Sequence, residues 1–155
     1  MPQLVKGGKH AYGWSEVSAT GKCAVPSDAL EEYNLKPPCK LFLLPGSKSS
    51  GGFAVTTASL LTNSVLARLL DENPKLASFQ LPEGETILIN GKPYCWTRLK
   101  TDGCITVPLK ALKQYGINAG DHLLSVRGSC FALAFCVKGP IIEEAKKHPN
   151  LILLK

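Results

Sequence analysis

Hydrophobic and polar residues follow the same order twice along this chain. In residues 21–35 a turn glycine leads into a short β-rich run, which ends at Val25-Pro26 and continues as one or two turns of amphipathic helix. Residues 103–117 repeat this succession through Val107-Pro108. Proline suits the first helical position because its missing N–H would have no partner there. We therefore expect a change from strand to helix at each Val-Pro pair, followed by one buried helical face: Ala29, Leu30 and Tyr33 in the first copy, and Ala111, Leu112 and Tyr115 in the second.

These stretches belong to a longer internal repeat of constant spacing. Adding 82 to any residue number from 12 to 47 gives its counterpart without a gap, and eleven of these 36 pairs are identical. Unrelated stretches of average composition would share roughly two or three. Because a repeat fixes the architecture of a chain, we predict two units, residues 1–82 and 83–155, packed into one compact body.

Most of each unit shows the patterns of short strands. Alternation of apolar and polar residues predicts strands at 12–18 and 94–100. Further strands are expected in the first unit at 3–6, 40–44 and 53–56, and in the second at 86–89, 122–126 and 131–135. Asn90-Gly91 indicates a tight hairpin turn, since both residues tolerate positive φ. The loop after residue 44 is expected to be four residues longer than its counterpart.

Each unit then continues into a helix and a final apolar strand. An apolar stripe runs from Val65 to Leu70 in the first unit, and Pro140 begins the helix of the second. Apolar runs at 76–81 and 151–154 follow. The predicted fold class is mainly β with short helices, and the apolar helices are expected to cover the sheet.

Length and composition place the chain among compact globular proteins. It has 155 residues, 45% of them hydrophobic, which is enough for a substantial core. No apolar run approaches the length that spans a bilayer, and the first residues lack the pattern of a signal peptide. We therefore expect a soluble cytoplasmic protein with no membrane association.

The six cysteines do not have the spacing of a metal site. They stand at positions 23, 39, 95, 104, 130 and 136, without a C-x-x-C pair and without a position shared by both copies. The three histidines are scattered. We expect reduced thiols that behave as small hydrophobic residues, with no metal and no cofactor.

Charge is distributed unevenly between the units. The formal net charge of +6 divides into +2 for residues 1–57, −2 for residues 58–90 and +6 for residues 91–155. The second unit is therefore the electropositive one, which favours an anionic partner.

The second copy carries a motif of a known family. Asp102-Gly103-Cys104-Ile105-Thr106-Val107-Pro108, followed by Tyr115-Gly116-Ile117-Asn118-Ala119-Gly120-Asp121, resembles the pattern G-R-ϕ-x-ϕ-P … L-G-ϕ-x-x-G-D of the AbrB/MazE/MraZ superfamily, in which ϕ is apolar. The resemblance covers about residues 12–57 and 94–138. It implies a swapped-hairpin β-barrel, and because family members usually dimerise by exchanging hairpins, two units in one chain imply an intramolecular pseudo-twofold dimer. Family members are mostly DNA-binding transcriptional regulators or antitoxins.

Several positions depart from the family pattern. The arginine after the turn glycine is Lys22 in one copy and Cys104 in the other, and the arginine usual in the short helix is replaced by Leu30 and Leu112. The first helix is acidic, with Asp28, Glu31 and Glu32. DNA contact is therefore expected to depend mainly on the second repeat.

Two hypotheses for function follow. In the first, the protein binds duplex DNA, because basic side chains neutralise phosphates and release counterions; the candidate contacts are Lys22, Arg98, Lys100, Lys110, Lys113 and Arg127. An ordinary solvated surface explains the lysines equally well. Trp14 and Trp96 could pack against sugar, but paired aromatics at symmetric positions favour a core role at the interface between the halves.

The alternative is a non-catalytic protein-interaction module that kept the barrel and lost DNA binding. Its partner, or a second copy of the chain, would dock on the acidic first helix or on the apolar helix Val65–Leu70. We do not expect an enzyme, because no nucleophile–base pair, phosphate loop or carboxylate pair occurs at a useful spacing.

Overall fold

The computed structural model describes residues 2–5, 8–62, 64 and 66–155. Within these residues the protein is mainly β, with short helices, which confirms the predicted class. The strands are β1 Ala11–Glu16, β2 Lys22–Ala24, β3 Cys39–Pro45, β4 Phe53–Thr56, β5 Ile87–Ile89, β6 Lys92–Leu99, β7 Cys104–Thr106, β8 His122–Arg127, β9 Leu133–Cys136 and β10 Leu153–Leu154. The helices are α1 Ser27–Glu32, α2 Ala58–Leu61, α3 Ala67–Glu72, α4 Pro74–Ala77, α5 Leu109–Gln114 and α6 Pro140–Ala145.

Strands from the two halves are interleaved within shared sheets. Eight strands form one sheet in the order β10-β1-β8-β9-β4-β3-β6-β5, and β2 pairs with β7 in a second. In the repeat, β1 corresponds to β6, β3 to β8 and β4 to β9. The central order β1-β8-β9-β4-β3-β6 is therefore symmetric, because replacing each strand by its counterpart reverses the order. The described strands form an open sheet with β10 and β5 as its edge strands. They do not make the closed barrel that was expected.

The two halves contribute almost equally to one central core. The main cluster of buried residues contains Val25, Tyr33, Leu41 and Val55 together with their second-half counterparts Val107, Tyr115, Leu123 and Phe135. Two buried hydroxyls make equivalent hydrogen bonds in the two halves, beside this core. Ser15 Oγ donates to the Ala24 carbonyl at 2.6 Å, and Thr97 Oγ1 donates to the Thr106 carbonyl at 3.0 Å. Each bond fixes a long strand to the short strand that follows it.

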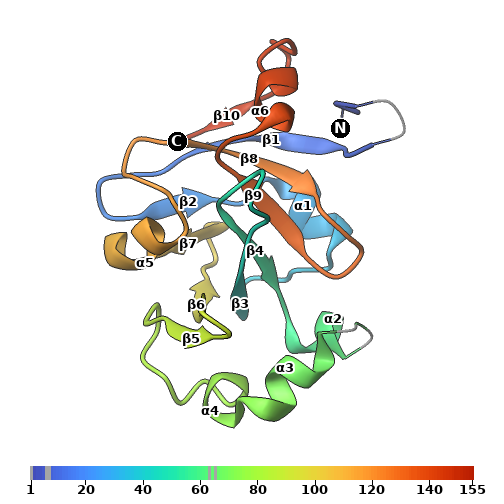
Figure 1. Ribbon diagram of the computed structural model, residues 1–155. Coiled ribbons are helices and arrows are strands. Elements are labelled where there is room, and N and C mark those ends of the chain that lie inside the picture. Colours follow the sequence, from blue (N-terminus) through green and yellow to red (C-terminus); the bar gives the residue numbers. More distant parts are fainter. Residues whose placement is uncertain (1, 6–7, 63, 65) are drawn as a thin grey trace.

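Two smaller clusters lie at opposite ends of the molecule, where α6 and β10 form one end and α2, α3 and α4 form the other (Figure 1). Trp14 packs on the first cluster and Trp96 is buried in the second. The two tryptophans do not meet each other, but each has the expected core role against the other half. Trp96 packs on Phe42 and Phe79, and Trp14 packs on the cluster that contains Leu124 and Ile142. They alternate with the core-facing residues of β1 and β6, so they point to the outer side of the sheet.

The hairpins show a different alignment from the one predicted after residue 47. Phe42 pairs with Thr56, and its counterpart Leu124 pairs with Cys136. Phe53 therefore corresponds to Leu133, and the first loop, 46–52, exceeds the second, 128–132, by two residues instead of four. Phe131 precedes β9 and accepts a hydrogen bond from Thr56 Oγ1 through its carbonyl, at 2.6 Å.

The segments after the hairpins also differ from the prediction. Residues 58–77 form three short helices in place of one, and residues 76–81 complete α4 and a loop in place of a strand. Val65, with which the predicted apolar helix begins, lies outside the described residues. The second unit follows the prediction more closely, since Pro140 occupies the start of α6 and β10 follows. Asn90 and Gly91 have φ of 53° and 78° in the hairpin between β5 and β6, as expected.

Gly21 and Gly103 occupy equivalent turns but have different surroundings. Their φ values are 86° and 79°. A Cβ on Gly21 would lie 1.9 Å from the Val107 carbonyl oxygen, whereas a Cβ on Gly103 would meet nothing closer than Leu30 Cδ1 at 3.8 Å. The first turn is therefore closed against the opposite strand, and the second is open.

This difference gives a matched pair of variants. Gly103→Ala should lower the free energy of unfolding by about 1 kcal/mol through backbone strain alone. Gly21→Ala should lower it by about 3 kcal/mol, because the clash with Val107 adds to the strain. Urea denaturation of both variants measures the two losses, and equal losses would contradict the closed turn at Gly21.

Candidate nucleic-acid interface

The six candidate residues lie in four separate places. Lys22 and Lys100 come together at the β2–β7 pair. Lys110 and Lys113 lie on α5. Arg98 and Arg127 lie on β6 and β8, each beside a carboxylate.

An acidic residue lies between the two lysines of the β2–β7 pair. Lys22 Nζ is 3.1 Å from Asp102 Oδ2, and Asp102 Oδ1 accepts the Cys104 N–H at 3.0 Å. The hydrogen bond from Cys104, then the one from Lys22, and also the charge of Lys100, lower the pKa of Asp102. Asp102 in turn raises the pKa of Lys22. The three charged side chains are exposed, so the cluster is a solvated surface with a net charge of about +1.

Helix α5 presents two further lysines to solvent. It follows Pro108 and buries Ala111 and Leu112, which turns Lys110 and Lys113 outward. Helix α5 lies on the same side of the molecule as β2 and β7 (Figure 1). Lys110 also lines a shallow pocket with Glu83 and Glu85, whose carboxylates reduce the local positive charge.

Arg98 lies on β6 and forms an ion pair with Glu83. Its guanidinium lies 3.6 Å from Glu83 Oε1 and 5.6 Å from the centre of the Trp96 ring. Glu83 Oε2 also accepts hydrogen bonds from the backbone N–H of Arg98 at 2.8 Å and from the Thr97 hydroxyl at 3.0 Å. The side chain therefore helps to hold the connection between the two units against the sheet.

Arg127 belongs to a network with the acidic helix α1. It lies 3.2 Å from Glu32 Oε1, while Glu32 Oε2 accepts the Tyr12 hydroxyl at 2.8 Å. Burial, reinforced by this hydrogen bond to Glu32, raises the pKa of Tyr12. Burial likewise raises the pKa of Tyr33 to about 12, and its hydroxyl donates to the Ser129 carbonyl at 2.6 Å. Arg127 thus joins the second half to the first, with its charge balanced by Glu32.

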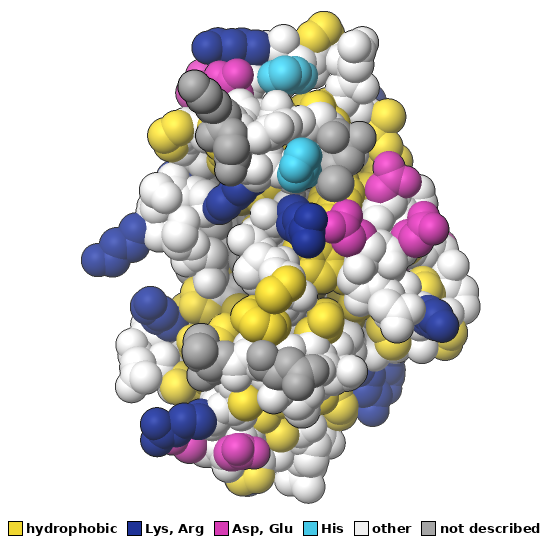
Figure 2. Space-filling model, turned by 90° about the vertical axis from the view of Figure 1, so that its right-hand side faces the viewer, with side chains coloured by type: hydrophobic (Ala, Val, Ile, Leu, Met, Phe, Trp, Pro, Cys, Tyr) yellow, Lys and Arg dark blue, Asp and Glu magenta, His cyan; other side chains and the backbone are white. Residues whose placement is uncertain are grey.

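Basic residues do not dominate the face that Figure 2 displays. Lys and Arg side chains are scattered over it, several of them beside Asp or Glu, around an apolar patch (Figure 2). Sequence reasoning identified the basic residues but missed their acidic partners Asp102, Glu83 and Glu32. The strand register gives no signal for the first of these, because Lys22 pairs with Thr106 and reaches Asp102 only through its long side chain.

The apolar surface suggested for a protein partner is only partly exposed. Within the described residues, Leu70 packs against the cluster of Trp96, and Leu66 is 42% exposed beside α3. No residue of α3 is fully buried. The helix therefore covers the end of the sheet with one side and leaves apolar surface on another.

The cysteines are all present as thiols and differ in burial. Cys23, Cys95 and Cys136 are buried, Cys39 and Cys104 are half-buried, and Cys130 is exposed. Among the residues described, no three His, Cys, Asp or Glu side chains are grouped as metal ligands. The metal-free state of the purified protein stays a prediction. The same residues include no helix long and apolar enough to cross a membrane.

Comparison of the sequence with protein-family models gave no match, and comparison with curated proteins found no similar sequence.

Thiol reactivity should follow burial. At pH 8, iodoacetamide should label Cys130 first and leave Cys23 and Cys95 unmodified, because burial raises their pKa values to about 12 and about 11 and excludes the reagent. Peptide mass mapping after short exposures measures the order, and labelling in denaturant serves as the control. Early modification of Cys23 in the native protein would contradict the packing of β2.

Proposed function

We propose that this protein binds duplex DNA through a surface formed by the β2–β7 pair and helix α5. The observation that carries the proposal is the pairing of one short strand from each half, which brings Lys22 and Lys100 together next to the exposed Lys110 and Lys113 of α5. Within the part of the chain that the structure describes, Lys100, Lys110 and Lys113 take part in no ion pair. Their charges are available to phosphates.

The proposal includes the swapped-hairpin arrangement of AbrB-like proteins. Support comes from the strand order, in which each hairpin of one half lies beside strands of the other: β4 pairs with β9, β3 with β6, and β1 with β8. In this arrangement the β2–β7 pair lies between α1 and α5, as the two halves of a DNA-binding dimer would place their helices on either side of a common axis.

The proposed surface is asymmetric. Lys110 and Lys113 of α5 correspond to Asp28 and Glu31 of α1. A carboxylate at a phosphate contact loses the attraction and adds a repulsion. Arg98 and Arg127 form ion pairs with Glu83 and Glu32, so they should contribute less to phosphate binding than the sequence suggested. Since operator symmetry mirrors protein symmetry, two unlike halves should recognise an asymmetric site in place of a palindrome.

The lysines of α5 provide the direct test. The double variant Lys110→Glu and Lys113→Glu should weaken binding to every duplex sequence and lower the salt slope by about one to two units, since each lost phosphate contact removes roughly 0.9. Fluorescence anisotropy with random and genomic duplexes at several salt concentrations measures both effects.

A charge-matched control separates this surface from general basicity. Lys48 in the β3–β4 loop and Lys75 in α4 are exposed and lie outside the proposed surface, so their double change to Glu should affect binding much less. If both double variants lost the same DNA affinity, binding would depend on the net charge of the protein and not on this surface. A parent protein without salt-dependent binding would overturn the DNA role and favour the protein-interaction module.

Asp102 should act against DNA binding. Asp102→Asn keeps a side-chain oxygen for the Cys104 N–H but removes the negative charge next to Lys22 and Lys100. The variant should bind duplex DNA more tightly, with a salt slope about one unit steeper, because Lys22 gains a phosphate contact. Asp71→Asn on α3 makes the same change in net charge far from this surface. A gain of the same size from Asp71→Asn would place the contacts elsewhere.

A further inference from the structure

The two tryptophans of the repeat have different neighbours. Beside Trp96 the ring of Phe79 fills the outer side of the sheet, stacked on Phe42 with centroids 5.1 Å apart and edge-on to Trp96 at 5.3 Å. Lys40 Nζ lies over both rings, 4.8 Å from the centre of Phe79 and 5.5 Å from that of Trp96. Trp96 is only 4% exposed as a result, and its Nε1–H donates to the Leu81 carbonyl at 2.7 Å. At this end of the sheet, Phe42 and Phe79 of the first half and Trp96 of the second thus form a completed aromatic cluster.

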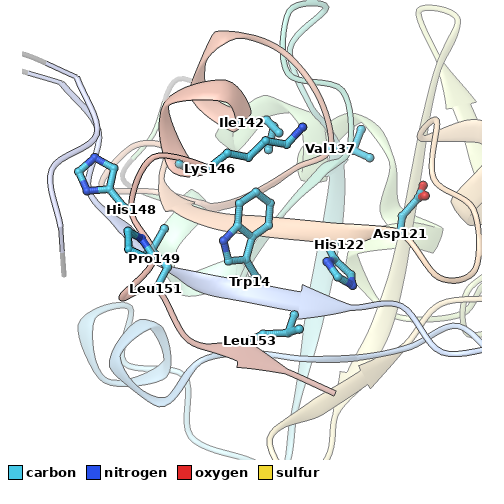
Figure 3. Close-up of a pocket in the computed structure, with 11 residues that line it drawn as sticks. Trp14, Asp121, His122, Val137, Ile142, Lys146, His148, Pro149, Leu151 and Leu153 are labelled. Carbon is cyan, nitrogen blue, oxygen red and sulfur yellow. The ribbon is translucent and has the colours of Figure 1, made fainter.

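At the opposite end of the sheet the corresponding place is a surface pocket. Trp14 is the counterpart of Trp96 and His122 that of Lys40. Both line an open pocket of about 460 Å³ that is bordered by α6, the segment after it and β10. In Figure 3 the Trp14 indole lies at the centre of this pocket, with Ile142 and Lys146 above it and Leu153 below.

The length of the chain after each helical region explains the difference. The first unit continues from Asn73-Pro74 through α4 to Phe79, which turns back onto the sheet with a φ of 59°. The second unit passes from His148-Pro149 directly into β10, where Leu153 pairs with Trp14. The shorter segment supplies one strand but no aromatic ring, so the outer side of Trp14 is left to the pocket.

We propose that this pocket binds an uncharged planar aromatic ring, which would take the place on Trp14 that Phe79 takes on Trp96. The volume lies within the range of small-molecule sites and suits one or two fused rings. Aromatic pairs at such centroid distances add to the free energy of burying apolar surface. Ile142, Ala145 and Leu151 provide the apolar wall.

The charges at the rim favour a neutral ligand. Each basic side chain there already has an acidic neighbour: Lys146 is 3.5 Å from Glu143, His148 is 3.8 Å from Glu144, and His122 is 3.3 Å from Glu16. An anionic ligand would have to compete with these pairs, and it would also be repelled by the carboxylate of Asp121, which lines the pocket. The binding of an aromatic ring does not depend on the proposed DNA surface and is measured on the protein alone.

The two tryptophans allow a test with an internal control. Protein labelled with ¹⁵N at its tryptophan indoles should show two Nε1–H signals, which Trp14→Phe assigns. Titration with indole should shift the Trp14 signal saturably, with a Kd on the order of 0.1–1 mM for so small a ligand, while the Trp96 signal stays fixed. No shift up to about 5 mM, or equal shifts of both signals, would overturn the proposal.

A second probe distinguishes the source of the ring. N-acetyltryptophanamide presents the same indole with a capped peptide backbone. Weaker binding than indole would indicate a free aromatic compound, and equal or tighter binding would indicate an aromatic side chain of a peptide; both results support the pocket.

Matched variants locate the binding. Leu153 lines the pocket and is 40% exposed, whereas Leu88 on the edge strand β5 is 67% exposed and lies outside it. Leu153→Asp should weaken indole binding at least fivefold, because the ring would have to displace water from a carboxylate, and Leu88→Asp should leave binding unchanged. If Leu153→Asp binds indole as well as the parent does, or Leu88→Asp weakens binding equally, the proposal fails.

Discussion

The structure depends on the burial of each half's apolar surface against the other half. A unit of about 80 residues with strands this short has too small a core of its own, so its hairpins pair with strands of its counterpart. The pairing of β4 with β9 joins the two hairpins at the centre of the large sheet, and β2 with β7 joins the halves again on another side. Val25 and Val107 enter the same core from the two directions.

Symmetry is retained where the halves meet and lost at the ends of the molecule. Ser15 and Thr97 make equivalent hydrogen bonds beside the core, because a change in either would disturb the strand pair that both halves share. At the outer ends the last segment of each unit packs against the tryptophan of the other unit, and the two ends differ: Phe79 completes the cluster around Trp96, whereas β10 leaves a pocket beside Trp14. Both proposed binding surfaces use this asymmetry.

Charged residues differ in the same way between the contacts that join the halves and the outer surface. Glu32 binds Arg127 across the halves, and Glu83 binds Arg98 at the connection between the units. These pairs give the two arginines a structural role and reduce their contribution to an anionic contact. Lys110 and Lys113 lie on the outer side of α5, where no core contact restrains the choice of residue, and their counterparts on α1 are acidic. Charge has therefore diverged on the surface while the buried face of each helix has been kept.

The sequence alone determined the repeat, the Val-Pro changes from strand to helix and the Asn90-Gly91 turn, because each follows from local backbone preferences and periodicity. It also identified the core faces of α1 and α5. It did not determine which side chains meet across the halves. The pairing of Lys22 with Asp102, the true alignment of Phe53 with Leu133 and the position of Phe79 against Trp96 join residues far apart in the chain. Such contacts are decided by register and by the path of the connecting segments, which only the tertiary structure defines.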